Sequence, residues 1–226
     1  MSTGSPGESV RRDVMVTPFG DRRGPGVLVV HSGRGMTEFI ERLCGRLAHN
    51  GFVGYAIDLF DGERPTSIEE AAQCKAQLTT DEAIDRLEDA VAFLSSYREV
   101  SRPQVGILGL GFGGELALEF ADTGPADLGA LVVYYAFADI DWGGLEVPYI
   151  GHYAEFDPEI PHSQLRAAQR RMAETDQRCE FKVYEGTEPS FFEEEPTARF
   201  DPDKAGKSWD VTQRFLRWAL FESPGR

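Results

Sequence analysis

The sequence predicts an α/β protein in which a doubly wound, mostly parallel sheet is covered by helices on both faces. Short apolar runs alternate along the chain with segments whose apolar residues recur at helical spacing. That alternation is typical of parallel strands joined by helical crossovers. A glycine-rich turn, Gly109-Leu-Gly-Phe-Gly-Gly114, also stands between an apolar run and a helical segment, as it does in several enzymes of this fold class.

The apolar runs give the strands in chain order. We expect strands at Val27–His31, Phe52–Asp58, Gln104–Leu110, Leu131–Ala136, Tyr149–Ala154 and Glu180–Tyr184.

Helices are expected between these strands. The stripe from Ile40 to Leu47 ends at Asn50–Gly51, a helix C-terminal signal. Two capping boxes, which begin at Ser67 and Thr79, each start a helix. Further helices are predicted at Phe112–Asp122, at Ser163–Thr175 and from about Asp203 to Phe221, where Trp209, Phe215, Leu216 and Trp218 are the expected packing residues.

Length and composition predict one globular unit. The chain has 226 residues, and we expect a flexible segment at 1–12 followed by a single domain at 13–226. A net charge of −15 argues against nucleic acid and anionic membranes as partners. Three cysteines without paired spacing, no signal-peptide pattern and no long apolar run predict a cytoplasmic protein with reduced thiols.

The glycine-rich turn predicts the strand-turn-helix structure called a nucleophile elbow. In G-x-S-x-G or G-x-C-x-G the flanking positions must be small because the backbones nearly touch. Gly109 and Gly113 take those positions, which puts Gly111 where the nucleophile would stand. Because an elbow holds that residue in a conformation poor for side chains, we expect unusual φ and ψ angles at Gly111.

Two other glycine motifs are less compatible with this segment. A phosphate-binding loop needs a lysine after its last glycine, and none follows Gly113 or Gly114. The spacing of Gly109, Gly111 and Gly114 does match a dinucleotide-binding fingerprint. That fingerprint normally follows the first strand and has an acidic residue at a later strand end, whereas Asp127 lies in a polar loop.

Several segments in order carry a resemblance to a known family. They are HSGRG after the first long strand, GFVGYAIDLF, GLGFGG, GHYAEFDPEIP, VYEGT and FDPDKAGKSWDVTQRFL. From about Gly24 to Leu220 the chain resembles the dienelactone hydrolases, which have the α/β-hydrolase fold. The resemblance implies that fold, no metal or other cofactor, and a small carbonyl, lactone or ester-like ligand.

The same resemblance places the family's catalytic triad on this chain. Asp157 matches the acid, but Gly111 stands at the nucleophile position and Pro189 at the histidine position. Ser32 stands where the family has an acidic residue after its first strand. The departures fall on the positions that carry the chemistry, so ordinary hydrolysis is not expected.

An oxyanion hole can survive without a triad because backbone N–H groups form it. We expect Phe112 and Gly33 to supply those two donors. The candidate acid–base groups are His31 first and Glu188 second, with Asp157 as a former histidine partner or a loop-capping residue. Other polar pocket candidates are Ser32, His152 and Glu155.

Some neighbouring residues have a simpler interpretation. The run Glu193-Glu-Glu195 indicates that the loop after Glu188 is solvated. Tyr134, Tyr135, Trp142 and Tyr153 are expected to be core or pocket-wall residues. No set of His, Cys, Asp and Glu has metal-ligand spacing.

Three classes of function stay open. The favoured one is a non-hydrolytic enzyme, an isomerase, lyase or cyclase that uses the oxyanion hole on a small carbonyl compound. The second is a residual ester or lactone hydrolase with an unrecognised nucleophile. The third is a non-catalytic protein that binds a small molecule or has a structural role. The sequence does not specify the substrate, the reaction or the oligomeric state.

Overall fold

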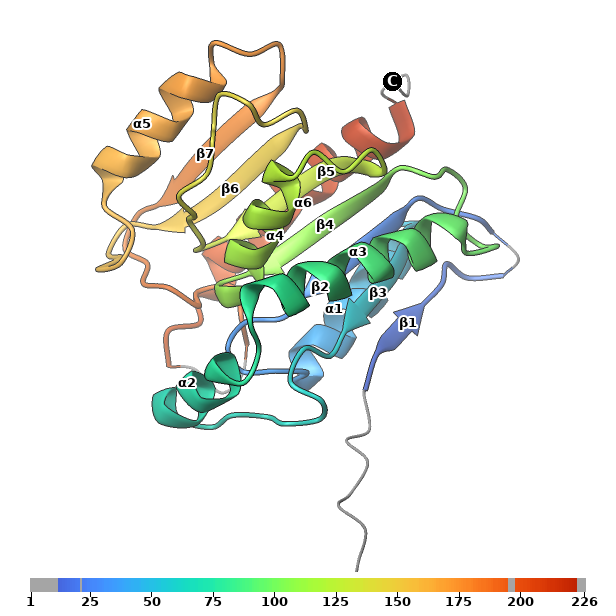
Figure 1. Cartoon of the computed structure of the whole chain (residues 1–226), viewed down its shortest axis with the longest axis horizontal. Helices are drawn as coiled ribbons and strands as arrows, with labels where there is room; N and C mark the ends of the chain where they lie inside the picture. The colour runs from blue at the N-terminus through green and yellow to red at the C-terminus, as the bar shows by residue number, and fades with distance from the viewer. Residues whose placement is uncertain (1–11, 21, 195–197, 223–226) are drawn as a thin grey trace, which may run out of the picture.

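The computed structural model describes residues 12–20, 22–194 and 198–222. Most of the segment expected to be flexible, 1–12, therefore lies outside the described residues, and so does Glu195. Seven strands form one sheet in the order β1-β3-β2-β4-β5-β6-β7 (Figure 1). The strands are β1 Val14–Val16, β2 Gly26–Val30, β3 Val53–Ile57, β4 Val105–Leu110, β5 Leu128–Tyr134, β6 Tyr149–Ala154 and β7 Cys179–Tyr184.

The sheet is parallel except at one edge, where β1 pairs antiparallel with β3. This confirms the predicted α/β-hydrolase fold with its mostly parallel sheet. β1 was not anticipated, because three half-buried residues are too few to give a periodic pattern. β5 begins at Leu128, earlier than the predicted Leu131, since Gly129 interrupts the apolar run at its start.

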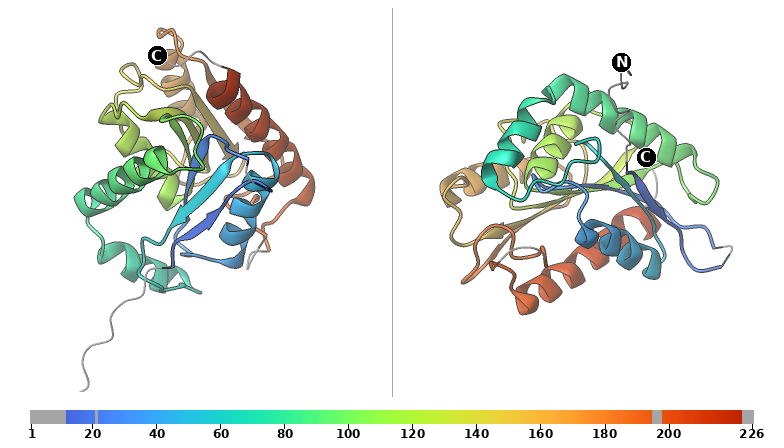
Figure 2. Two further views of the ribbon diagram at one scale, coloured as in Figure 1. Left: turned by 90° about the vertical axis from the view of Figure 1, so that its right-hand side faces the viewer. Right: turned by 90° about the horizontal axis from the view of Figure 1, so that it is seen from below.

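Helices cover both faces of the sheet (Figure 2). One face carries α3 Thr80–Ser96, α4 Phe112–Asp122 and α5 His162–Met172, and the other carries α1 Glu38–His49 and α6 Pro202–Arg217. The central strands β2 and β4 are buried along their whole length because both of their faces are covered. A short helix, α2 Ile68–Ala76, buries no side chain, and a π-helical turn, Trp218–Glu222, follows α6.

The predicted helix signals form the expected local structures. Thr79 and Glu82 make a reciprocal capping box at the start of α3. Gly51 has a φ of +88° after α1, as a C-terminal glycine should. The first signal fixes where α3 begins, and the second fixes where α1 ends before the chain enters β3.

Candidate functional site

The turn between β4 and α4 has the geometry of a nucleophile elbow. Gly111 has φ +48° and ψ −118°, a conformation that L side chains rarely adopt, which confirms the predicted unusual backbone. Its N–H donates to the carbonyl of Tyr134 over 2.9 Å. A Cβ on Gly109 would lie 2.6 Å from the Gly113 carbonyl oxygen, so the flanking position admits only glycine.

Two side chains line the space beside Gly111. A Cβ on Gly111 would lie 3.8 Å from Ser32 Cβ and 3.9 Å from Tyr135 Cδ2. Ser32 follows the end of β2 and Tyr135 follows the end of β5, so both come from the carboxyl end of the sheet, where open α/β sheets bind their ligands. Gly111 and Phe112 are half-buried, so part of this turn is exposed to solvent.

A third residue, Glu193, joins these two side chains. Its carboxylate accepts a hydrogen bond from Ser32 Oγ over 2.7 Å and another from the Tyr135 hydroxyl over 2.8 Å. Glu193 is only 1% exposed. The interpretation of its loop as solvated is therefore wrong for Glu193, although the next residue, Glu194, is exposed and pairs with Arg42.

The aromatic pair before Glu193 explains why this residue is buried. Phe192 stacks on Tyr134 with ring centroids 4.1 Å apart, and Phe191 packs edge-on to Tyr135. Two fully buried phenylalanines hold the loop against the core, so the next side chain points inward. The Phe191–Phe192 doublet was the available sequence signal, and the three consecutive glutamates obscured it.

Burial sets the electrostatics of this cluster. It raises the pKa of the Glu193 carboxyl, against the opposing hydrogen bonds from Ser32 and Tyr135 and the charge of Arg34. Burial, followed by the Glu193 charge, raises the pKa of the Tyr135 phenol well above its ordinary value. Tyr135 is thus a neutral donor near pH 7, and the Glu193 carboxyl holds its proton more tightly than a solvated glutamate does.

Tyr135 holds its position at the expense of backbone strain. Its φ is +39°, which is rare for a bulky residue. Its N–H donates to the carbonyl of His152 over 2.7 Å, and this bond fixes the strained turn. Strain of this kind persists where the surrounding structure imposes it, most often at functional sites.

His31 lies directly before Ser32, but both of its ring nitrogens have protein partners. Nδ1 contacts the Ser32 carbonyl at 2.7 Å, and Nε2 accepts from the Leu59 N–H over 3.1 Å. Complete burial lowers the pKa of His31. The ring is a neutral link between the end of β2 and the loop after β3.

His152 is also part of the packed interior. Its ring stacks on Tyr134, Nδ1 contacts the Tyr184 hydroxyl at 2.8 Å, and Nε2 contacts Thr212 Oγ1 at 2.9 Å. Burial, with a smaller effect from Lys182, lowers the pKa of His152 to about 3. This imidazole is neutral at physiological pH and faces other side chains of the core.

The remaining predicted polar residues are engaged in loop hydrogen bonds or surface ion pairs. Asp157 accepts from the N–H groups of Glu159 and Ile160, as a loop-capping aspartate does. Glu155 accepts from the Gly186 N–H over 2.8 Å. Glu188 is exposed and forms an ion pair with Arg199 at 2.9 Å, and its neighbour Pro189 is half-buried.

The backbone N–H groups expected to act as donors are those of Phe112 and Gly33. Within the described part of the chain, the N–H groups of Phe112 and Gly33 donate to no backbone carbonyl. Phe112 begins α4, so the positive end of that helix lies at the same point. Among the described residues, no group of three or more His, Cys, Asp or Glu side chains is placed to hold a metal ion.

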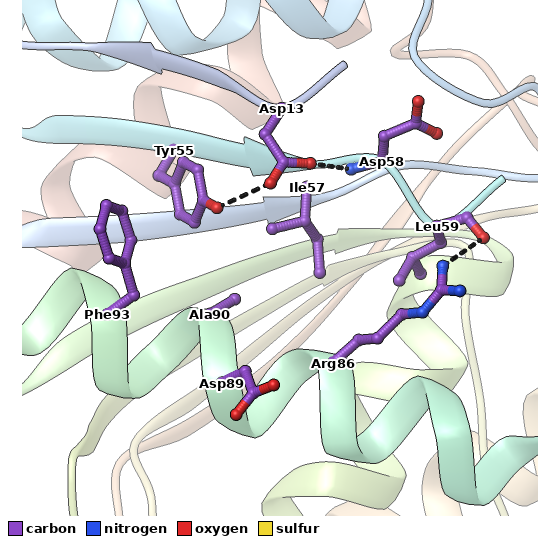
Figure 3. A pocket seen from close by; sticks show the side chains of 9 residues that line it. All are labelled: Asp13, Tyr55, Ile57, Asp58, Leu59, Arg86, Asp89, Ala90 and Phe93. Atoms are coloured by element: carbon purple, nitrogen blue, oxygen red, sulfur yellow. Dashed lines mark hydrogen bonds between the residues drawn. The ribbon is translucent and has the colours of Figure 1, made fainter. Parts of the chain in front are cut away.

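Two pockets lie elsewhere in the molecule. One, of about 170 Å³, sits between β3 and α3; Asp13 and Tyr55 line one side and Arg86 the other (Figure 3). Leu59 lines this pocket and donates its N–H to the ring of His31, which lies directly before Ser32 in the chain. The other, of about 880 Å³, lies at the amino ends of the central strands and includes Gln104, Leu128 and Pro148.

Comparison with known proteins assigns the family. The family model described as "Dienelactone hydrolase family" matches residues 12–220. The chain belongs to the dienelactone hydrolase family. No helix in the described part of this family member is long and apolar enough to cross a membrane.

Individual relatives agree with this assignment. The family member is 28% identical over 203 residues to "Protein usf" of Aquifex pyrophilus, covering 86% of this chain and 88% of that protein. It is 26% identical over 206 residues to the "Putative carboxymethylenebutenolidase" of Aquifex aeolicus, covering 87% and 89%. Among solved structures, the "Putative Dienelactone Hydrolase" of Klebsiella pneumoniae superposes with a TM-score of 0.78 at 20% identity over 91% of each chain, which shows a shared fold.

Proposed function

We propose that this protein moves a proton on a small carbonyl compound, of the enol-lactone type, and does not hydrolyse it. The observation that carries the proposal is the buried carboxylate of Glu193 beside a turn whose central residue, Gly111, has no side chain. A glycine at that position offers no nucleophile, whereas a basic carboxylate next to backbone donors suits proton abstraction.

The proposed step follows from the residues around Gly111. Glu193 takes a proton from the carbon next to the substrate carbonyl, and the electron pair of that C–H bond passes to the carbonyl oxygen. The resulting enolate oxygen accepts hydrogen bonds from the N–H groups of Phe112 and Gly33, at the positive end of α4. The protonated Glu193 exchanges its proton with water and then delivers a proton to a different carbon of the conjugated system, which isomerises the double bond.

The partners of Glu193 fit this role. Ser32 and Tyr135 each donate one hydrogen bond, and with a further side-chain hydrogen bond from Ser190 a lone pair is still left for the substrate proton. The two donors also fix the orientation of the carboxylate. His31, His152 and Glu188 are assigned no catalytic step, because both imidazoles are engaged in the core and Glu188 is paired at the surface.

One contact favours a second candidate function. Ser32 Oγ lies 2.7 Å from Glu193, a distance at which a serine and its base can act as a nucleophilic pair. A residual lactone or ester hydrolase would use Ser32 in this way. It would form an acyl-enzyme, which the proton-transfer reaction does not.

An enol lactone distinguishes the two candidates in one assay. α-Angelica lactone incubated in D₂O yields its conjugated isomer with deuterium incorporated if proton transfer operates, and levulinate if hydrolysis operates. We expect isomerisation that Glu193→Gln reduces by at least about 100-fold, the size typical of a lost general base. Levulinate formed together with covalent labelling of Ser32 would establish the hydrolase instead.

A further inference from the structure

The helix α2, Ile68–Ala76, is held together mainly by its own caps. Ser67 Oγ accepts from the Glu70 N–H over 3.1 Å, and the Glu70 carboxylate accepts from the Thr66 N–H over 2.8 Å. None of its side chains is buried. Figure 1 shows α2 set off from the helices that cover the sheet. Local capping of this kind lets a helix keep its shape without tight packing.

One side of α2 nevertheless faces the candidate site. Lys75 Nζ lies 4.9 Å from the centre of the Phe112 ring. A Cβ on Gly33 would lie 3.1 Å from Lys75 Cε and 3.6 Å from Ala71 Cβ. The helix therefore sits on both residues whose backbone N–H groups form the floor of the site.

Firm attachment points flank this segment. Pro65 is buried, and the Glu63 carbonyl packs on Gly35, where a Cβ would approach to 2.5 Å. On the other side, Thr79 belongs to the capping box of α3. Residues 66–78 thus connect two fixed points, and this segment rests on the body through the half-buried side chains of Ala71, Cys74 and Leu78.

We propose that residues 66–78 form a lid, which closes over the Phe112 and Gly33 N–H groups through Lys75 and opens as a rigid helix. In the closed state the Lys75 ammonium lies near the N-terminus of α4, whose partial charge is also positive. The Glu115 carboxylate in the first turn of α4 attracts Lys75, so closure without a ligand sets this attraction against the repulsion from the helix N-terminus. The role of the lid rests on the proposed function: an enolate oxygen on the two donors attracts Lys75 and stabilises the closed state.

The chain carries its own reporter of lid opening in Cys74. This thiol is half-buried on the body-facing side of α2, whereas Cys44 lies in the core and Cys179 on β7. Labelling with the neutral reagent N-ethylmaleimide, followed by mass spectrometry, gives a rate for each thiol in one sample. Lid opening should make Cys74 react much faster than Cys44, whose exposure requires unfolding.

Lys75→Met tests the closing contact. The variant keeps most of the apolar stem and removes the ammonium group. Because one exposed cation–π contact is lost, we expect the rate of Cys74 labelling to rise about two- to five-fold. Removing a positive charge near a thiol lowers its thiolate fraction, which would slow labelling, so a rise reports opening. Lys207→Met, at an exposed position of α6, is the matched control. An unchanged Cys74 rate, or an equal rise at Cys179, would overturn the proposal.

A disulfide lock tests the motion itself. The Cβ separation of 3.6 Å at Gly33 and Ala71 fits a disulfide, so Gly33→Cys with Ala71→Cys should form one. We expect the oxidised protein to label at Cys74 at least about ten-fold more slowly than the reduced protein. Equal rates would show that Cys74 reacts without opening, and failure of the disulfide to form would contradict the closed geometry. Neither labelling experiment needs a substrate. Failure of the lid proposal can therefore be distinguished from failure of the proposed function, which Glu193→Gln tests.

Discussion

The carboxylate of Glu193 accepts a hydrogen bond from the hydroxyl of Ser32 over 2.7 Å, although 161 residues separate them in the chain. This bond joins the loop after β2 to the loop after β7, directly beside the elbow at Gly111. An acidic group is thereby present where the resemblance to the family leads one to expect it. It comes from a different part of the chain, because Ser32 occupies the position after the first long strand.

The buried carboxyl makes stability depend on pH in a defined direction. Burial raises the folded-state pKa of Glu193 above the ordinary 4.5, so the folded state holds this proton more tightly than the unfolded state. The resulting stabilisation is complete below pH 4.5 and is lost as the pH rises through the folded pKa. The Glu193→Gln variant has a neutral side chain at every pH, so it does not lose stability in this way.

Urea unfolding across this pH range checks the prediction. The unfolding free energy of Glu193→Gln relative to wild type should increase with pH by up to about 1.4 kcal/mol per pH unit. Glu194→Gln, which removes only a surface ion pair, should change stability by less than about 1 kcal/mol. A Glu193→Gln difference that is flat from pH 4 to 8 would show that this carboxyl has the same pKa in both states.

The elbow conformation predicts the effect of restoring a side chain. Gly111 has a φ of +48°, so Gly111→Ser should lower the unfolding free energy by about 1–3 kcal/mol while the fold is retained. Gly45→Ser, at an open helical position without steric contacts, is the control for adding the same group. Thermal denaturation measures both variants. A Gly111→Ser protein as stable as wild type would mean that the turn tolerates a side chain without strain.

The two tyrosines at the end of β5 allow a hydrogen bond to a carboxylate to be compared with a hydrogen bond to a neutral hydroxyl. Tyr135 donates to the buried Glu193, whereas the adjacent Tyr134 bonds the neutral Thr212. Tyr135→Phe removes one hydrogen-bond donor from a carboxylate and should lower the free energy of unfolding by about 1–3 kcal/mol. Tyr134→Phe should lower it by about 0.5–1.5 kcal/mol. Removing the Tyr135 hydroxyl should also raise the pKa of Glu193 further. Equal costs, without any change in the pH dependence, would argue against an ionised Glu193.

His152 gives a direct spectroscopic prediction. Burial lowers its pKa to about 3, so its ring should stay neutral from pH 5 to 8. The unfolded chain takes up the proton below its ordinary value of 6.5, so this residue reduces stability as the pH falls below that value. The ring proton resonances of His152, assigned by comparison with His152→Gln, should not shift in this window. A titration near pH 6 would place the ring in water.

Strong local signals predicted most of the fold. The buried strands β2 and β4 are continuous apolar runs, and the glycines of the elbow are required by the backbone contacts that they make. β1 was missed because pairing with β3, and not a periodic pattern, makes it a strand. Predictions based on local pattern succeed where the local sequence alone determines the structure.

The site was harder to predict because its contacts are long-range. Gly111 and Ser32 were recognised from their positions, yet the partner of Ser32 lies in a glutamate run that resembled a solvated loop. His31 and Glu188 were reasonable candidates by residue type, but the structure surrounds one with backbone partners and pairs the other at the surface. Burial of a charged residue depends on tertiary packing, here on Phe191 and Phe192, which residue type does not reveal.

The central claim is that Glu193 transfers a proton beside a turn without a nucleophile. The most direct measurement is proton NMR of α-angelica lactone in D₂O with wild type, Glu193→Gln and Glu194→Gln. The account predicts deuterium incorporation and the conjugated isomer with wild type and with Glu194→Gln, and at least about a 100-fold loss with Glu193→Gln. Hydrolysis to levulinate without isomerisation, or isomerisation that Glu193→Gln leaves intact, would contradict it.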